Sequence, residues 1–163
     1  MSTTRPCGPA ATQPLFTGGY TTPNHSVGHS PVQDRKDARN ASETLNSADF
    51  KATILANPIE LVDFWAPWCG PCRAFAPVFE RSAKNHTDIV HAKVDTDAQR
   101  ELAAIVGIRS VPTIMAFREG ILVCSRPGAM PPAVLEDLIG QIKGLDMARV
   151  RTRIAERKAA AKV

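Results

Sequence analysis

The sequence predicts an α/β sandwich built around a mixed β-sheet, and two patterns support this prediction. Apolar runs typical of buried strands alternate with stretches of helical periodicity, which favours parallel pairing at the centre of the sheet. Further along, two short strand-like runs flank Glu119-Gly120, and this arrangement is typical of an antiparallel hairpin. No apolar run reaches the roughly 18 residues that a membrane-spanning helix needs, so a membrane span is excluded.

Two helices and two strands are expected in the first half of the sandwich. Asn46-Ser47 can cap a helix, and its inward-facing apolar residues should be Phe50, Ile54 and Leu55. The run 59–66 is mostly apolar, which indicates a strand buried on both faces. A helix over 69–85 would place five residues on one buried stripe: Cys72, Phe75, Ala76, Phe79 and Ala83. The next strand should cover 89–95, and 43–45 could form an edge strand before the first helix.

The second half should add a short helix, the hairpin and a longer final helix. The short helix would present Ala98, Leu102, Ile105 and Val106 and end at Gly107, a residue type common at helix C-termini. The hairpin strands should span 113–118 and 121–126. The final helix would open at Pro131-Pro132 and bury a row of residues at helical spacing: Leu135, Leu138, Ile139, Ile142 and Leu145. Residues 146–163 should continue this helix or fray from it.

Three segments differ in composition and charge. Residues 1–41 are rich in Pro and Gly and carry a net charge of +2; because they bury too little apolar surface to offset their ordering entropy, we expect a flexible N-terminal extension. Residues 42–145 should be the folded domain, at −2, and 146–163 a basic helical C-terminal extension, at +4. No aromatic residues lie near the basic ones, so nucleic-acid binding is not expected. The N-terminus lacks the apolar segment of a secretory signal, which favours a cytoplasmic protein.

The four cysteines are Cys7, Cys69, Cys72 and Cys124, and only the middle two are closely spaced. A lone C-x-x-C could be a structural thiol pair, half of a metal site or a redox pair; the neighbouring Trp, Gly and Pro favour the redox pair. Cys69 would lie at a helix N-terminus, where the helix dipole and free N–H groups favour a thiolate. Cys72, one turn deeper, should be more sheltered and act as the resolving thiol. Cys124 should be a small core or edge residue.

The residues around this pair resemble the thioredoxin family. Trp68-Cys69-Gly70-Pro71-Cys72 matches the active-site motif of that family, and 62–66 precede it as they do there. The resemblance spans about 43–145 and continues through further stretches: Phe75-Ala76-Pro77, Ala92-Lys93-Val94-Asp95, Gly107-Ile108-Arg109, Val111-Pro112-Thr113 and Gly128-Ala129. The second class of bacterial thioredoxins, which carries an N-terminal zinc ribbon, is the most similar.

The resemblance implies the thioredoxin fold, a three-layer α/β/α sandwich, and reduction of protein disulfides by Cys69 and Cys72 without a cofactor. Gly70 and Pro71 between them would tune the pair toward a reductant. Asp63 would be a buried carboxylate with a raised pKa that takes the proton from Cys72. Lys93 would be the partner of Asp63. The alternatives are an Asp63 that reaches water at the end of its strand and a Lys93 on the surface.

The resemblance also implies a substrate surface and partners. Pro112 would follow a cis peptide and face the two sulfurs, which leaves the Val111 backbone to pair with substrate. Trp68, Gly128 and Ala129 would complete that surface. The expected partners are proteins that contain disulfides and an NADPH-dependent thioredoxin reductase, and the protein should be a monomer.

The N-terminal segment departs from the zinc-ribbon class. A structural zinc needs about four ligands, usually two C-x-x-C pairs, whereas residues 1–41 contain only Cys7. We therefore predict no structural zinc; Cys7 could instead be a reactive thiol, or join His25 and His29 in adventitious metal binding. Two other functions stay open. The Gly70-Pro71 dipeptide disfavours an oxidant or isomerase, and the intact cysteines and Asp63 disfavour a binding module without redox chemistry.

Overall fold

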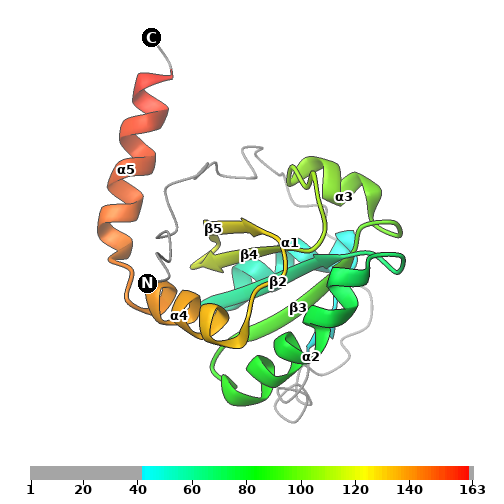
Figure 1. The fold of residues 1–163 in the computed structure, drawn as a ribbon. Coiled ribbons are helices and arrows are strands. Elements are labelled where there is room, and N and C mark those ends of the chain that lie inside the picture. Colours follow the sequence, from blue (N-terminus) through cyan, green and yellow to red (C-terminus); the bar gives the residue numbers. More distant parts are fainter. Residues whose placement is uncertain (1–41, 162–163) are drawn as a thin grey trace, which may run out of the picture.

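The computed structural model describes residues 42–161 and confirms the α/β sandwich (Figure 1). Five strands form one sheet in the order β1-β3-β2-β4-β5. They are β1 (Glu43–Thr44), β2 (Ile59–Trp65), β3 (Val90–Asp95), β4 (Thr113–Arg118) and β5 (Ile121–Pro127). β1 and β2 run parallel to β3, while β4 is antiparallel to β2 and β5, so the sheet is mixed as predicted. The expectations for 1–41, with Cys7, His25 and His29, lie outside the described residues.

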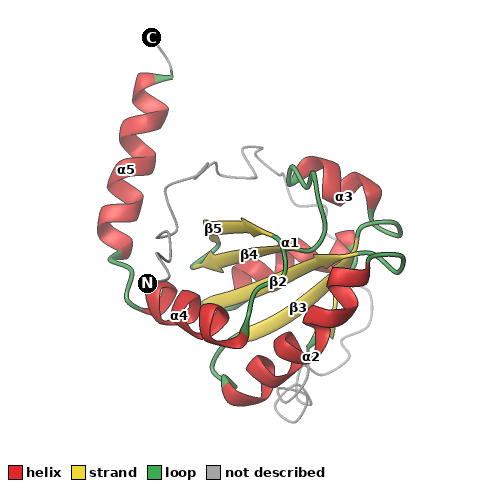
Figure 2. Ribbon diagram, in the orientation of Figure 1, coloured by secondary structure: helices red, strands yellow, loops and turns green. Residues whose placement is uncertain are grey.

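Helices cover both faces of the sheet (Figure 2). α1 (Ser47–Ala56) and α3 (Arg100–Ile105) lie on one face, and α2 (Gly70–Asn85) and α4 (Pro132–Lys143) lie on the other. Because successive strand residues point to opposite faces, β2 supplies both cores. The α1/α3 core includes Phe50, Ile54, Val62, Phe64, Leu102 and Phe117. The α2/α4 core includes Leu61, Phe75, Phe79, Ile114, Cys124, Leu135, Leu138 and Ile139.

The hairpin is confirmed with the strand bounds close to those expected. Glu119 and Gly120 both have positive φ, at 52° and 77°, which is the backbone geometry of a tight two-residue hairpin turn. A Cβ at position 120 would also lie 2.9 Å from the Leu55 side chain. Glycine therefore fits this turn for two reasons, its conformation and its contact with α1.

Three residues predicted to face the core are exposed. Ala98 precedes α3, which begins at Arg100, and is exposed; the other two lie on helices that face the sheet with one narrow stripe. On α1, Phe50 and Ile54 are buried, but Leu55 is 64% exposed. On α3, Leu102 is buried and Ile105 is 63% exposed. Residues four apart share a helix face, whereas the next residue is rotated by about 100°. The apolar composition of these segments did not show which of two adjacent residues would face inward.

The chain beyond α4 also differs from the prediction. α4 ends at Lys143, and Asp146 starts a separate helix, α5 (Met147–Ala160), by accepting hydrogen bonds from the N–H groups of the next helix's first turn. Leu145 in the connection is therefore only half-buried. The Arg118 guanidinium binds three carbonyls at the end of α4, those of Ile142, Lys143 and Leu145, at 2.7–3.1 Å.

α5 extends away from the sandwich beside the β4–β5 turn, where Arg151 forms an ion pair with Glu119 (Figure 1). The part of the C-terminal segment that the structure describes is thus helical from Met147 to Ala160. None of the helices within 42–161 is both long and apolar enough to cross a bilayer.

Candidate active site

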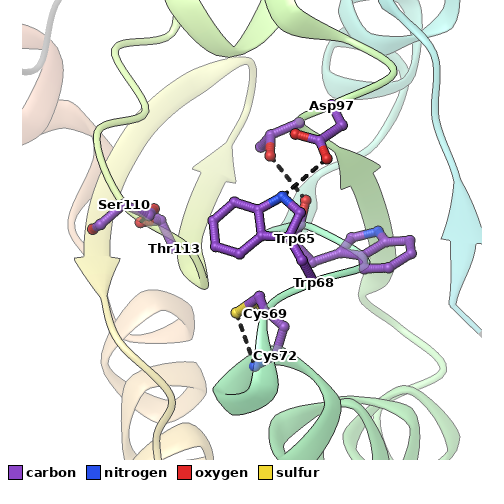
Figure 3. The surroundings of a disulfide bond; sticks show 8 residues. Trp65, Trp68, Cys69, Cys72, Asp97, Ser110 and Thr113 are labelled. Atoms are coloured by element: carbon purple, nitrogen blue, oxygen red, sulfur yellow. Dashed lines mark hydrogen bonds between the residues drawn. A yellow bond between two sulfur atoms is a disulfide. The ribbon is translucent and has the colours of Figure 1, made fainter.

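A disulfide joins Cys69 and Cys72 at the N-terminus of α2, directly after β2 (Figure 3). The two Cα atoms lie 5.3 Å apart, a separation typical of disulfide-bonded cysteines. Cys69 is the N-cap of α2, and its Sγ accepts a hydrogen bond from the Cys72 N–H at 3.2 Å. Pro71 occupies the first turn, where its missing N–H costs no helical hydrogen bond. The predicted position of the pair at a helix start is confirmed.

The expected difference in shelter between the two cysteines is not seen. Cys69 is 4% exposed and Cys72 is 3% exposed, and both pack with Ala66 in a small apolar cluster. What distinguishes them is their place in the helix. Cys69 faces the free N–H groups of the first turn, whereas Cys72 lies inside that turn. The N-terminal sulfur is therefore the one that the helix end can stabilise as a thiolate.

A second loop lies against the disulfide cluster. The Val111–Pro112 peptide bond is cis, as expected, and Val111 packs against the cluster that contains both cysteines. The Gly128 N–H donates to the Pro112 carbonyl at 2.8 Å, so the loop after β5 is tied to this proline. Gly128 has a φ of +94°, which favours glycine there. Ala129 beside it is exposed.

Trp68 lies on the surface next to the disulfide and is 69% exposed. Its indole Nε1–H donates to Oδ2 of Asp97 at 3.0 Å (Figure 3). Asp97 comes from the connection between β3 and α3, so the ring is held by a segment far away in sequence. An exposed aromatic ring held in place beside a reactive group is suited to contact another protein.

Asp63 is buried, only 1% exposed, and its Oδ1 has no hydrogen-bond partner among the described residues. The alternative that it reaches water at a strand end is therefore wrong. Burial raises the pKa of Asp63 to about 7, because a carboxylate is poorly solvated there; the Lys93 ammonium opposes this rise and the Glu80 carboxylate adds to it. A carboxyl group with this pKa can exchange a proton near neutral pH.

Lys93 lies beside Asp63 in the parallel pairing of β2 and β3, as predicted, but its ammonium bonds elsewhere. Nζ donates to Oε1 of Glu80 on α2 at 2.6 Å. The backbone N–H and the hydroxyl of Ser42 also donate to Glu80. These bonds to Lys93 and Ser42 outweigh the effect of partial burial and lower the pKa of Glu80. Lys93 is thus an electrostatic neighbour of Asp63 and a direct partner of Glu80.

Three residues of this site were missed from the sequence: Ser42, Glu80 and Asp97. Each acts through a contact with a residue distant in the chain, 38 positions from Ser42 to Glu80 and 29 from Trp68 to Asp97. Glu80 comes directly after Phe79, which lies on the buried stripe of α2. In the sequence, this charged residue next to the stripe was the one sign of a partner for Glu80. Within residues 42–161, no three His, Cys, Asp or Glu side chains gather in a way that could hold a metal ion.

A disulfide across the first turn of a helix, at the end of a central strand of an α/β sandwich, defines a site for thiol–disulfide exchange. Known proteins point to the same chemistry. The family model described as thioredoxin matches residues 41–141. A Streptomyces coelicolor protein named as a thioredoxin 2 is 50% identical over 117 residues, covering 72% of this chain and 87% of that protein.

Other relatives agree with this match. Thioredoxin 1 of Synechococcus elongatus is 44% identical over 97 residues, which is 58% of this chain and 91% of that protein. Among solved structures, a mutant thioredoxin from Halobacterium salinarum superimposes with a TM-score of 0.62 at 33% identity, covering 66% of this chain and 96% of that one.

The chain therefore belongs to the thioredoxin family. It has the thioredoxin fold and is a protein thiol–disulfide oxidoreductase with protein-disulfide reductase activity.

Proposed function

We propose that Cys69 is the attacking residue and Cys72 the resolving residue in the reduction of protein disulfides. The Cys69 thiolate attacks one sulfur of a substrate disulfide, forms a mixed disulfide and releases the other substrate sulfur as a thiolate. Cys72 then attacks Cys69, which releases the second substrate sulfur and closes the Cys69–Cys72 bond. Two electrons pass from the protein dithiol to the substrate, and the two leaving thiolates take up the protons.

The observation that carries this assignment is the cap of α2. The sulfur of Cys69 occupies the N-cap position and accepts the Cys72 N–H, where a hydrogen bond to a charged acceptor is stronger than to a neutral one. No equivalent donor reaches the sulfur of Cys72 among the described hydrogen bonds. This asymmetry supports Cys69 as the nucleophile.

Asp63 is proposed to accept the proton that Cys72 loses before it attacks. Asp63 and Leu61 point to the same face of β2, and Leu61 packs with Phe75 and Phe79 of α2. Cys72 lies on the same buried stripe of α2, one turn before Phe75. It is therefore closer than Phe75 to the end of β2 that leads into the helix. Lys93 would act on Asp63 through its charge.

The substrate surface is proposed to consist of Trp68, the Val111–Pro112 peptide, Gly128 and Ala129. Pro112 is buried, whereas Trp68, Gly128 and Ala129 are exposed around the disulfide cluster. An extended substrate segment could pair with the Val111 backbone and lie between Trp68 and the loop after β5. Gly70 and Pro71, between the cysteines, would favour a reducing pair.

We further propose that a thioredoxin reductase regenerates the dithiol and that the cysteine pair is the whole redox group, with no metal or other cofactor. A monomer, a cytoplasmic location, no contact with membranes or nucleic acid, and the division into 1–41, 42–145 and 146–163 stay predictions.

The test compares insulin reduction by the wild-type chain, Cys69→Ser and Cys72→Ser. Cys69→Ser should abolish turnover, because no nucleophile remains at the helix cap. Cys72→Ser should accumulate a mixed disulfide with substrate, visible as an adduct by mass spectrometry. If Cys72→Ser forms no adduct while Cys69→Ser does, the two roles are reversed. A wild-type chain that cannot cycle between dithiol and disulfide in a dithiothreitol buffer would support the binding module instead.

A further inference from the structure

Asp63 belongs to a cluster of three ionisable side chains that come from three different elements. Asp63 lies on β2, Lys93 lies beside it on β3, and Glu80 reaches Lys93 from α2. The Lys93–Glu80 ion pair is short, at 2.6 Å, and its side chains are 20% and 34% exposed. Lys93 forms no ion pair with Asp63, whose Oδ1 is left without a partner in the described part of the chain. The ammonium next to a buried carboxylate is therefore bonded to a different carboxylate.

Glu80 is held firmly in this position. Ser42, just before β1, donates to it twice, from its backbone N–H and from its hydroxyl. With the bond from Lys93, Glu80 accepts three hydrogen bonds, two from Ser42 and one from β3. A side chain that needed only to be solubilised on a helix surface would not require such contacts. The arrangement fixes where the ammonium of Lys93 lies.

Apart from Lys93 and Glu80, the groups next to Asp63 are uncharged, and the nearest further cation on this face is one strand away. β4 places Ile114 opposite it, and α2 contributes Cys72 and Phe75 to this face. The buried side chains of α4 are apolar. His91 lies on the same face of β3, but its buried ring is neutral because burial lowers its pKa to about 4. Arg126 of β5 lies on the same face one strand further away, opposite Ile114. Lys93 and Glu80 are the two charges that act on Asp63.

We propose that Glu80 is a positioning residue, which holds the Lys93 ammonium and so leaves Asp63 free to bind a proton beside the cysteine pair. This inference rests on the proposed role of Asp63 as proton acceptor. While Glu80 is ionised, it balances the charge of Lys93, and an ionised Asp63 would add an unbalanced buried charge. Without Glu80, the positive charge of Lys93 would be balanced only by ionised Asp63. Glu80 thus supports the protonated form of Asp63.

The decisive variant is Glu80→Gln, which keeps the shape and removes the charge. The apparent pKa of Asp63 is followed by ¹³C NMR of its side-chain carboxyl in the oxidised protein, where the cysteines do not titrate. We expect this pKa to fall by about 1 unit or more, since Glu80 would no longer balance the Lys93 charge and a nearby opposite charge lowers the pKa of a carboxyl by about 1–3 units. Lys93→Gln should shift it upward. An Asp63 pKa that stays within 0.3 units of wild type, or rises, in Glu80→Gln would overturn the proposal.

Glu136→Gln is the matched control. Glu136 lies on α4, on the same face of the sheet, and its Oε2 is 2.6 Å from Nε2 of His86, but Glu136 does not act on Asp63. It should leave the Asp63 pKa unchanged. Ser42→Ala should produce a smaller downward shift than Glu80→Gln, because it loosens Glu80 without removing its charge; an effect of opposite sign would contradict the proposed positioning.

A second readout separates this proposal from the proposed function. If Asp63 is the proton acceptor, the pH profile for insulin reduction by Glu80→Gln should shift to lower pH along with the Asp63 pKa. If the NMR pKa falls but the activity profile does not move, and Asp63→Asn also keeps wild-type turnover, the role of Asp63 fails while the positioning by Glu80 stands. If the Asp63 pKa is unchanged in Glu80→Gln while Asp63→Asn has reduced turnover, the positioning by Glu80 fails and the role of Asp63 stands.

Discussion

β2 carries two buried carboxyl groups three residues apart, and they face opposite sides of the sheet. Glu60 is 0% exposed and Asp63 is 1% exposed, and both have carboxylate oxygens without hydrogen-bond partners among residues 42–161. Asp63 lies on the α2/α4 side with Lys93 and Glu80. Glu60 lies with Val62 and Phe64 on the α1/α3 side, where the charge that acts on it is Glu43, of the same sign.

The comparison shows that burial alone does not make a functional carboxyl group. Burial raises the pKa of Glu60 to about 8, with a smaller contribution from Glu43, and raises that of Asp63 to about 7. The two pKa values are similar, but only Asp63 lies toward the end of β2 that leads into Cys69 and only Asp63 has an opposite charge beside it. Glu60 lies at the other end of the strand. We therefore assign proton transfer to Asp63 and expect Glu60 to affect only stability.

The largest effect should come from Glu60→Met, which fills the same space without a charge. The folded pKa of Glu60 lies above its usual 4.5, so the folded state binds its proton more tightly than the unfolded state. The wild type should lose stability as pH rises from about 4.5 to about 8, at up to ~1.4 kcal/mol per pH unit. Glu60→Met should remove this loss and gain on the order of 4–5 kcal/mol at pH 9, measured by urea unfolding of the oxidised protein.

Glu43→Gln is the control for this prediction, because it removes only the neighbouring exposed charge and should change stability by less than about 1 kcal/mol. Turnover of insulin by Glu60→Met should equal that of wild type. A variant that loses activity at unchanged stability would give Glu60 a role that the comparison denies it.

Asp63→Asn should have a smaller effect on stability but a large one on activity. The folded pKa of Asp63 is raised from 3.8 to about 7, so the wild type should lose stability as pH rises across this window. Asp63→Asn should gain on the order of 3–4 kcal/mol above pH 7. Its turnover should fall by about 10²-fold, the lower end of general-base catalysis. A stable variant with full turnover would remove the functional difference between the two carboxyl groups.

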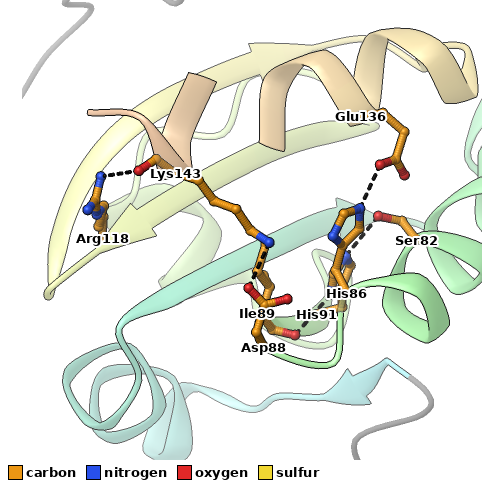
Figure 4. Close-up of polar contacts among 8 residues, drawn as sticks. All are labelled: Ser82, His86, Asp88, Ile89, His91, Arg118, Glu136 and Lys143. Carbon is orange, nitrogen blue, oxygen red and sulfur yellow. Dashed lines mark hydrogen bonds and ion pairs between the residues drawn. The ribbon is translucent and has the colours of Figure 1, made fainter. Parts of the chain in front are cut away.

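The smallest of the three effects on stability should come from His91. Burial lowers the pKa of this group, so its contribution to stability changes with pH in the opposite direction to those of Glu60 and Asp63. Its Nε2 lies 3.1 Å from the Ser82 hydroxyl and its Nδ1 lies 3.2 Å from the Ile89 carbonyl (Figure 4). Burial lowers its pKa from 6.5 to about 4, although the bond to Ile89 opposes this. Stability from neutral His91 is complete above pH 6.5 and is lost as pH falls toward 4.

His91→Gln should therefore lower the unfolding free energy at pH 7, relative to that at pH 4, by about 2–3 kcal/mol compared with wild type. Ser82→Ala removes the hydroxyl but leaves the imidazole, so it should keep the pH dependence of the wild type. If both variants have the same slope below pH 6.5, His91 is not the group that titrates.

Several elements were predictable because their signals are local in the sequence. The turn at Glu119-Gly120 needs two residues that tolerate positive φ, and the pair Cys69/Cys72 spans one helical turn. The strand of Lys93 was also expected beside that of Asp63, whereas the register that pairs the two residues is seen only in the fold. By contrast, Leu55 and Ile105 are as apolar as their buried neighbours. Their exposure depends on the rotation of α1 and α3 against the sheet, which their composition does not encode.

The polar contacts of the site show the same limit. Trp68 was expected on the surface, but not the bond that holds it to Asp97. Lys93 was expected to be the partner of Asp63, but its ammonium donates a hydrogen bond to Glu80. The break before α5 depends on Asp146 capping a new helix and on Arg118 of β4 donating to the last carbonyls of α4 and to that of Leu145 after it. In each case a side chain has several possible partners, and only the packed fold determines which one is within reach.

The sequence by itself determined the fold class and the position of the cysteine pair, because strand and helix periodicity and a sulfur at a helix start are encoded within a few neighbouring residues. The family came from the resemblance of the motif Trp68-Cys69-Gly70-Pro71-Cys72 and the stretches that accompany it. The tertiary structure decided which of the two buried carboxyl groups on β2 has an oppositely charged neighbour, and which carboxylate binds Lys93. Coulomb interactions depend on distance in space and on solvent exclusion, and both are set only when distant segments pack together.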